Sequence, residues 1–158
     1  MINYFIKFDD LCLSTVRLFI YDESGAKQVK KYSVIEANEA LLPGNNLYIM
    51  IPSALFGFKV TRNEIGLKND ILKANIFSES EDGLISNVSD LKFFFQPSLN
   101  LAAWINYNTY NSIAEPFNEY EGDVYFYPEH FLLPEGINSI YVGEQNFICS
   151  FKDFTGFS

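Results

Sequence analysis

Histidine, cysteine and tryptophan are scarce in this chain of 158 residues, and their scarcity limits the chemistry open to it. His130 is the only histidine, which removes most metal sites and most schemes that need an imidazole base. We expect it to be a structural group that lies at the surface or is half-buried. The only cysteines, Cys12 and Cys149, lie far apart without a metal-ligand neighbour. We therefore expect two buried, reduced thiols and no disulfide. The only tryptophan, Trp104, lies in an apolar segment, and that position predicts packing in the core.

Basic residues are also few: the chain has 11 Lys and Arg and 20 Asp and Glu, which gives a formal net charge of −9. Binding to nucleic acids and to anionic lipids depends on Lys and Arg that neutralise phosphates. The charge balance therefore argues against nucleic acid or a lipid surface as the direct ligand. Basic proteins become the expected partners.

Long hydrophobic runs are absent, and no stretch approaches the ~20 apolar residues that a membrane-spanning helix needs. The first eight residues lack both the basic start and the apolar run of a secretory signal peptide. We therefore expect a soluble, cytosolic chain. The sequence also contains no Walker loop, no dinucleotide-binding fingerprint and no zinc-ligand spacing.

Aromatic residues, in contrast, are abundant: the chain holds 16 Phe and 10 Tyr within a hydrophobic content of 48%. Such a composition excludes disorder and favours β-sheet, because aromatic side chains suit pleated surfaces. The length is enough for one compact domain or two small lobes with a buried core.

The first half of the chain alternates between apolar and polar residues in a way that predicts a sheet. A near-continuous apolar run at 47–51 predicts a strand covered on both faces. The expected elements are strands at 2–8, 13–21 and 27–32, a helix at 34–42, the strand at 47–51 and a further strand at 56–62.

The next stretch changes to helical spacing and then back to strands. Leu67 and Ile71 recur one turn apart and are expected to pack under a small sheet, and Gly83 breaks the pattern. Together these pieces predict a small inserted α+β lobe. The expected elements are a helix at 67–81, strands at 91–95 and 99–105, a helix at 109–120, a strand at 123–127 that returns to the first sheet, a helical turn at 129–133, and a hairpin of 137–142 with 145–151.

Three short motifs, in their order, resemble one known family. The acids Glu81 and Asp82 precede a linker that contains Asp90, and the linker leads to the strand with Phe93 and Phe94. The segments YPEHFLLP at 127–134 and FICSFKDFTGF at 147–157 follow. This order resembles the cytoplasmic part of general secretion pathway protein L, an inner-membrane assembly component of bacterial type II secretion systems.

The resemblance implies an α/β fold: an actin-like, ribonuclease-H-like first subdomain with an inserted α+β lobe. On this basis residues 1–56 and 122–158 form that subdomain and the start of a second, and residues 57–121 form the lobe. The chain then corresponds to the N-terminal portion of the cytoplasmic domain. Family members carry one membrane-spanning helix further along, which would be the only attachment to the membrane.

The resemblance also implies a role without catalysis or cofactors. Proteins of this family hold the secretion ATPase, through its N-terminal domain, at the cytoplasmic face of the bacterial inner membrane. The implied partners are that ATPase, the M and F inner-membrane components and a second copy of the chain.

A candidate partner surface lies around the end of the predicted 67–81 helix. Glu79, Glu81 and Asp82 oppose the helix dipole there, which needs an explanation beyond helix stability. Solvation of an exposed end is one explanation, and an acidic docking point for a basic partner is the other. We expect the acids to form one edge of an ATPase contact, with Phe93 and Phe95 as its hydrophobic edge.

Nucleotide binding is the main alternative, because actin-like proteins hold phosphates in glycine-containing turns. The corresponding first turn offers Asp9, Asp10 and Ser14 but no glycine, and the late hairpin offers Gly143 without an aspartate. An actin-like ATPase is therefore disfavoured, as is the related type IV pilus M-type assembly protein, which keeps good phosphate turns. Asp9 or Asp10 could meet Glu129 in a ribonuclease-H-type metal site, but acids that face water at strand ends are the preferred interpretation.

Overall fold

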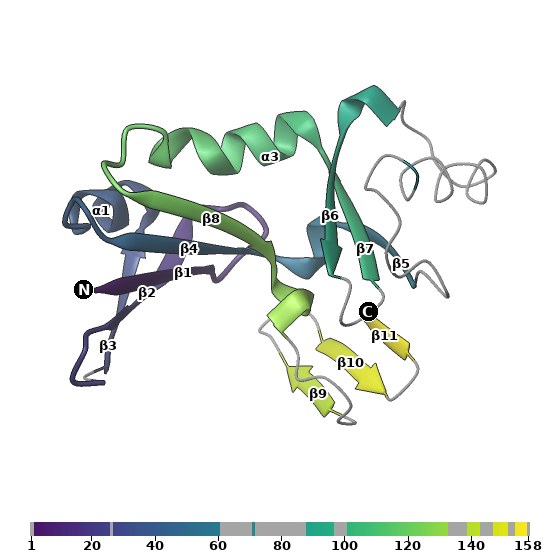
Figure 1. Ribbon diagram of the computed structural model, residues 1–158, viewed down its shortest axis with the longest axis horizontal. Helices are drawn as coiled ribbons and strands as arrows, with labels where there is room; N and C mark the ends of the chain where they lie inside the picture. Colours follow the sequence, from purple (N-terminus) through teal and green to yellow (C-terminus); the bar gives the residue numbers. More distant parts are fainter. Residues whose placement is uncertain are drawn as a thin grey trace.

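A computed structural model describes residues 2–25, 27–60, 71, 88–96, 101–132, 139–142, 147–151 and 154–157. The described part is a mixed α/β structure with a five-stranded sheet and two three-stranded sheets (Figure 1). No helix among these residues is both long and apolar enough to cross a membrane.

The five-stranded sheet has the strand order β3-β2-β1-β4-β8. The central strand β1 pairs antiparallel with β2 and parallel with β4, and β4 pairs parallel with β8. The predicted return of the 123–127 segment to the first sheet is therefore confirmed. Its strands are β1 (Asn3–Phe8), β2 (Thr15–Tyr21), β3 (Lys27–Ser33), β4 (Asn46–Ile51) and β8 (Asp123–Pro128).

Two helices cover one face of this sheet (Figure 1). The first, α1 (Val34–Glu39), begins with a capping box in which Ser33 and Glu36 each accept a hydrogen bond from the other's backbone N–H. The second, α3 (Tyr107–Ala114), is capped by Asn106 and continues as the 3₁₀ turn η4 (Glu115–Phe117). The predicted helix at 109–120 is thus wrong in its extent, because the proline in η4 cannot continue an α-helix.

Alternate strand residues point toward the helices and form the core. The buried set includes Tyr4, Ile6, Phe8, Val16, Leu18, Leu47, Ile49 and Ile51, with Ala37 of α1, Ile113 of α3 and Phe117 of η4. The prediction that β4 is covered on both faces is wrong within the described structure. Its other face carries Tyr48 and Met50, which are only half-buried. These side chains are apolar enough to continue the hydrophobic run although helices cover only one side.

The second sheet has the order β5-β7-β6 and is antiparallel throughout. Its strands are β5 (Gly57–Val60), β6 (Leu91–Gln96) and β7 (Leu101–Asn106), with the 3₁₀ turns η1 (Ser53–Leu55) and η2 (Val88–Asp90) before β5 and β6. Leu101, Ala103 and Ile105 join the same hydrophobic core as the first sheet. Because this core is continuous, the lobe boundaries at 57 and 121 stay a prediction.

Of the predicted 67–81 helix only Ile71 is described. It is helical, but 46% of it is exposed, so its expected burial under the sheet is wrong. The remaining residues of that helix, Leu67 included, lie outside the described part of the chain.

The third sheet follows β8 through the 3₁₀ turn η5 (Glu129–Leu132). Its order is β11-β10-β9, with β9 (Ser139–Val142), β10 (Phe147–Phe151) and β11 (Phe154–Phe157) antiparallel to their neighbours. The predicted pairing of 137–142 with 145–151 is confirmed.

Candidate functional site

The turn between β1 and β2 lies where an actin-like protein would hold phosphate. Here the Asp10 carboxylate accepts four hydrogen bonds: from Ser14 N at 3.1 Å, Ser14 Oγ at 3.0 Å, Thr15 N at 3.1 Å and Thr15 Oγ1 at 2.6 Å. These bonds favour the ionised form. They lower the pKa of Asp10 from 3.8 to about 2, and the bond from the Thr15 hydroxyl is the largest cause.

The chain's own carboxylate therefore takes the donors that a phosphate would use. Phosphate-binding turns direct backbone N–H groups and hydroxyls at the anion, and in this turn those groups already surround Asp10. Leu13 adopts a left-handed backbone conformation with φ of 58°, where glycine would be favoured. Cys12, which precedes it in the turn, is exposed, so the expected burial of this thiol is wrong. A phosphate that approached this turn would meet a negative charge.

The other acids considered for a ribonuclease-H-type site, Asp9 and Glu129, are paired with cations. The Asp9 side chain is only 3% exposed and pairs with Arg17 Nε at 2.8 Å and Lys31 Nζ at 3.2 Å. Glu129 pairs with Lys7 Nζ at 2.8 Å. The interpretation that these acids face water is therefore wrong, because strands β1, β2 and β3 bring cations against them. Within the described residues no group of three or more His, Cys, Asp or Glu could hold a metal ion.

His130 of η5 is buried, with 1% exposed, so the prediction of a surface or half-buried histidine is wrong. Its Nδ1 lies 3.1 Å from the hydroxyl of Ser53, which is also fully buried. The rings of Phe56 and Phe131 pack edge-on against the imidazole. Burial lowers the pKa of His130 from 6.5 to about 4. The pair has the residue types of a serine nucleophile and its base, but both side chains are buried among the described residues.

The Ser53–His130 contact instead joins two connections of the fold. Ser53 starts η1, which leads from β4 toward the second sheet, and His130 lies in η5, which leads from β8 toward the third. The sequence signal for the burial of His130 is the apolar residue that follows it in the YPEHFLLP segment, Phe131, which is also buried.

The predicted hydrophobic edge, Phe93 and Phe95 of β6, lies on the side of the second sheet that faces away from the core. The two rings stack with centroids 6.3 Å apart, and Trp104 of β7 lies 6.1 Å from Phe93. Phe94, between them in sequence, points the other way and packs on the core with Phe56. Trp104 is half-buried on this outer side, so its predicted core position is wrong.

Gly57 explains why the indole can lie there. In the antiparallel register Gly57 of β5 is the partner of Trp104, and a Cβ at Gly57 would overlap the indole ring. The glycine leaves the space in which Trp104 lies against β5. Sequence reasoning missed this residue, and the available signal was the glycine at the start of the predicted strand.

The structure thus places Phe93 and Phe95 side by side and adds Trp104 to them. We call these three residues the lobe aromatic strip. Glu79, Glu81 and Asp82, the predicted acidic edge of the same surface, lie outside the described residues.

Comparison with solved structures assigns the fold. The cytoplasmic domain of EpsL, an inner membrane component of the type II secretion system of Vibrio cholerae, matches 100% of this chain and 71% of its own, with a TM-score of 0.74 at 9% identity. The chain has the fold of that domain. A Bacteroides thetaiotaomicron protein of unknown function with an actin-like ATPase fold matches 98% of this chain and 67% of its own, with a TM-score of 0.53 at 11% identity. The predicted actin-like α/β class is confirmed. No family profile and no curated protein matches the sequence.

Proposed function

We propose that this protein is a non-catalytic component of a type II secretion system that holds the secretion ATPase at the cytoplasmic face of the inner membrane. The observation that carries the proposal is the likeness of the whole chain to the cytoplasmic domain of EpsL. The order of the sequence motifs, which was recognised independently of the fold, supports the same role. The M and F inner-membrane components are the further partners in this proposal.

The chemistry of the described residues supports docking rather than catalysis. The turn that would hold phosphate is filled by the Asp10 carboxylate, and Asp9 and Glu129 are paired with cations. The Ser53–His130 pair is enclosed by aromatic rings. A protein with these features can act by binding other proteins.

We place the ATPase contact on the lobe aromatic strip. Large aromatic side chains provide most of the binding energy at many interfaces, because they bury much area at a low entropic cost. Phe93, Phe95 and Trp104 are all half-buried and lie next to one another on one side of the sheet. The acids Glu79, Glu81 and Asp82 complete the proposed surface and would attract basic residues of the ATPase.

Isothermal titration calorimetry with the N-terminal domain of the secretion ATPase from the same organism tests this placement. Phe95→Ser should weaken binding at least tenfold, which corresponds to about 1.4 kcal/mol. Tyr125→Ser is the matched control, because Tyr125 is an exposed aromatic residue on the five-stranded sheet and should leave the affinity unchanged.

Charge reversal of Glu79, Glu81 and Asp82 to lysine tests the acidic edge in the same titration. We expect weaker binding and a lower sensitivity to salt. Equal affinity for all variants would remove this surface from the proposal, and no binding of the unaltered chain would remove the ATPase itself.

A nucleotide-dependent actin-like ATPase is the second candidate. The match to the actin-like ATPase fold and the aspartates at the end of β1 favour it. The four donors that surround Asp10 count against it, and against a type IV pilus M-type protein, because both functions need those donors for phosphate.

A further inference from the structure

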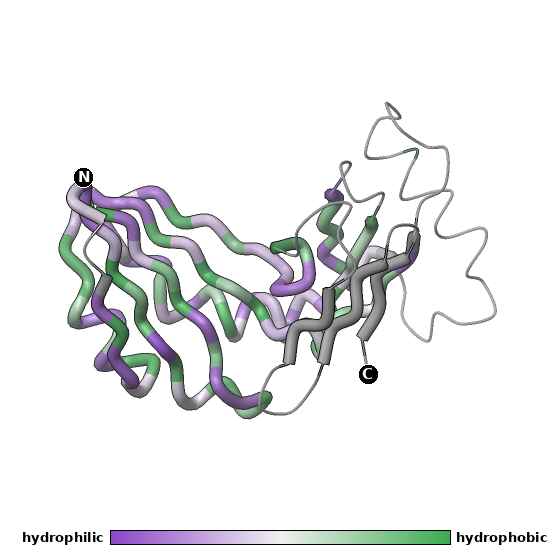
Figure 2. Tube along the Cα trace, turned by 90° about the horizontal axis from the view of Figure 1, so that it is seen from below, coloured by the Kyte–Doolittle hydropathy of each residue, from purple (hydrophilic) through white to green (hydrophobic). Residues whose placement is uncertain are grey.

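The chain leaves the five-stranded sheet twice, at neighbouring points. Strands β4 and β8 pair in parallel up to their last residues, Ile51 and Pro128. Figure 2 shows the strands of this sheet side by side. Beyond β4 the chain enters η1 and runs to the second sheet, and beyond β8 it enters η5 and runs to the third (Figure 1). Ser53 and His130 follow these paired residues at equal distances along the chain, so their 3.1 Å contact joins the two connections where they begin.

Consecutive side chains hold η5 in place, each against a different part of the fold. Glu129 pairs with Lys7 Nζ of β1 at 2.8 Å, and both side chains are largely buried. His130 contacts Ser53 of η1, and Phe131, which is 7% exposed, belongs to the hydrophobic core. A single turn of 3₁₀ helix has few backbone hydrogen bonds of its own. The position of η5 therefore depends on these side-chain contacts, and elements held in this way are the ones that open locally.

The His130 imidazole is enclosed by apolar rings. It is 1% exposed, and the ring centroids of Phe131, Phe56 and Phe58 lie 5.0, 5.8 and 5.9 Å from its own. The Ser53 hydroxyl, which is fully buried, lies within hydrogen-bond distance of Nδ1. A neutral imidazole suits such a site, whereas a charged one would lose its hydration among the rings.

The elements that pack on His130 carry few titratable groups. None occurs in η1, and in β5 Lys59 follows Phe58, so it points to the other side of that strand. On η5 itself Glu129 is paired with Lys7. The titratable side chains of β8 are exposed: Asp123, Tyr125 and Tyr127. Burial is accordingly the cause that lowers the pKa of His130 to about 4.

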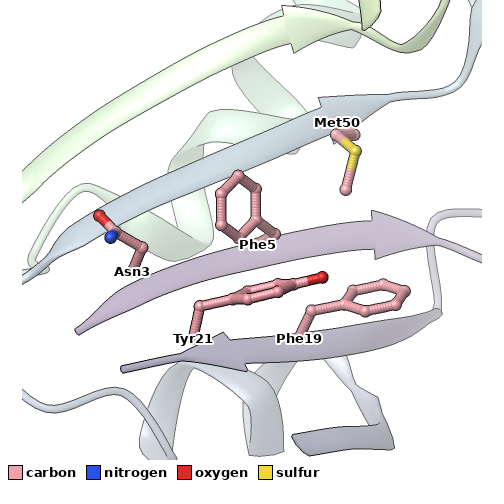
Figure 3. A pocket seen from close by; sticks show the side chains of 5 residues that line it. All are labelled: Asn3, Phe5, Phe19, Tyr21 and Met50. Carbon is pink, nitrogen blue, oxygen red and sulfur yellow. The ribbon is translucent and has the colours of Figure 1, made fainter. Parts of the chain in front are cut away.

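The five-stranded sheet has a depression, but it does not reach the Ser53–His130 contact. Its volume is about 420 Å³, and its lining residues are Asn3, Phe5, Phe19, Tyr21 and Met50 (Figure 3). Neither Ser53 nor His130 is one of them, so water in this depression does not hydrate the imidazole. Since the imidazole is 1% exposed, it becomes hydrated and protonated when η5 moves away from η1.

We propose that the Ser53–His130 contact is an acid-operated latch. Binding of a proton from solvent to the imidazole releases η5, together with Phe131, from the end of the five-stranded sheet, while the sheet itself stays folded. The connection to the third sheet is then no longer held at this point. No covalent bond changes, and the latch closes again when the proton leaves. This inference goes beyond the proposed function and does not depend on it.

The pH range of the latch follows from the two states of the imidazole. In the released state the ring is hydrated and has its ordinary pKa of 6.5, and in the closed state burial holds the pKa at about 4. The closed state is therefore most favoured above pH 6.5 and loses this advantage as the pH falls toward 4. Between these values each pH unit should raise the ratio of released to closed molecules by up to about tenfold.

Relaxation-dispersion NMR of the ¹⁵N-labelled chain tests the proposal, because it measures the population of a minor state residue by residue. The amides of Leu55 in η1 and Phe131 in η5 should report a minor state whose population rises about tenfold between pH 7.5 and pH 5.5. The amides of Ile6 in β1 and Leu18 in β2 should not report it, because they are exposed only when the whole sheet unfolds. Since His130 is the only histidine, its ring signals identify the imidazolium in the minor state.

Variants separate the titration of His130 from that of the neighbouring acid. His130→Gln keeps a polar side chain without the titration, so its minor-state population should not change with pH. Glu129→Gln is the matched control, which removes the pair with Lys7 and should keep the rise in acid. Circular dichroism would establish that both variants are folded. If His130→Gln did not fold, the unaltered chain and Glu129→Gln would still show whether the response requires Glu129.

Ser53→Ala tests the contact from its other side. Loss of this hydroxyl in η1 should raise the minor-state population at η5 about fivefold at neutral pH, because it weakens a buried polar contact. The effect would cross 77 residues of sequence. Ser112→Ala is the matched control, since it removes a hydroxyl that donates to the Asn108 carbonyl within α3 and should leave η5 unchanged.

The same measurements can overturn the latch. A minor state with equal populations at β1 and η5 would mean that the whole sheet unfolds. A population that does not depend on pH, or that loses its pH dependence in Glu129→Gln, would mean that His130 does not control the release. The absence of any minor state at η5 at pH 5.5 would equally reject the proposal.

Discussion

At the scale of single residues, the Asp10 carboxylate accepts hydrogen bonds from the groups in its own turn that could otherwise bind an anion. The turn between β1 and β2 keeps the donors of an anion site, namely two backbone N–H groups and two hydroxyls. The Asp10 carboxylate accepts a hydrogen bond from each of them, which stabilises the turn and leaves these donors occupied. The absence of glycine from the turn could be seen in the sequence, but the four hydrogen bonds to Asp10 could be seen only in the structure.

Removal of this carboxylate should cost stability in a pH-dependent way. Because the pKa of Asp10 falls from 3.8 to about 2 on folding, its contribution is complete above about pH 4 and is lost as the pH drops toward 2. Asp10→Ala should lower the free energy of unfolding by about 1 kcal/mol at neutral pH, as for the loss of a helix cap. Urea denaturation of both proteins would measure the difference. An equal stability at pH 7 would mean that the four hydrogen bonds only replace bonds to water.

His130 gives a second pH dependence, in a different range. The pKa of His130 is 6.5 before folding and about 4 after it, so protons bind more readily to the unfolded chain in between. Stability should therefore fall by about 2 kcal/mol from pH 7 to pH 5. Urea denaturation at both pH values measures the change. His130→Gln should remove this slope, and since His130 is the only histidine, a slope that persists would have to come from other groups.

At the scale of elements, the alternating strands could be predicted because their pattern depends on a single face that is buried. The five strands of the first sheet, the β9–β10 hairpin and the return of β8 follow from period-two alternation and turn residues. The predictions were wrong for several apolar residues that were expected to be buried and are not. Trp104 and Tyr48 are aromatic but lie on outer faces, and Ile71 is exposed. Periodicity shows which residues share a face, but not which face the rest of the chain covers.

Burial of polar residues was equally hard to predict, because it depends on partners that are distant in sequence. Asp9 is buried by cations from β2 and β3, and His130 is buried by Ser53 and phenylalanines from other elements. The sequence shows that each of these residues is present, but it does not show that the fold brings them together. That Phe93 and Phe95 lie side by side could be predicted, because they are alternate residues of one predicted strand. Their part in binding a partner stays a prediction.

The contact between β5 and β7 leads to a prediction for the lobe aromatic strip. Gly57→Ala should displace the Trp104 indole and lower the free energy of unfolding by about 1–3 kcal/mol, as other overpacking changes do. Trp104 is the only tryptophan, so its fluorescence emission should shift in the folded variant and also report the denaturation. In a Trp104→Leu background the same glycine change should cost much less, since the clash is gone. Equal costs in both backgrounds would show that the loss comes from the β5 backbone instead.

At the scale of the whole molecule, the chain combines an actin-like α/β fold with a first turn whose hydrogen-bond donors are already taken. In the actin-like proteins of the sequence comparison such a turn holds phosphate, whereas here the Asp10 carboxylate accepts from its hydroxyl and backbone N–H groups. Aromatic side chains also lie at the surface of two sheets, Phe93 and Trp104 on the second and Tyr125 on the first. The fold alone therefore does not decide the chemistry of the chain, and the first turn has to be judged from its own contacts.

The occupied donors around Asp10 predict how the protein responds to nucleotide. ATP with magnesium should leave the melting temperature of the protein unchanged, because the donors around Asp10 are taken and its charge repels phosphate. A nucleotide-binding protein at a hundredfold excess over Kd would gain about 2.7 kcal/mol, or roughly 5–10 °C for a chain of this length. Differential scanning fluorimetry detects such a shift easily, and an actin-like ATPase serves as the positive control. A clear shift for this chain that required both ATP and magnesium, and that magnesium alone did not produce, would reject the scaffold in favour of a nucleotide-binding protein.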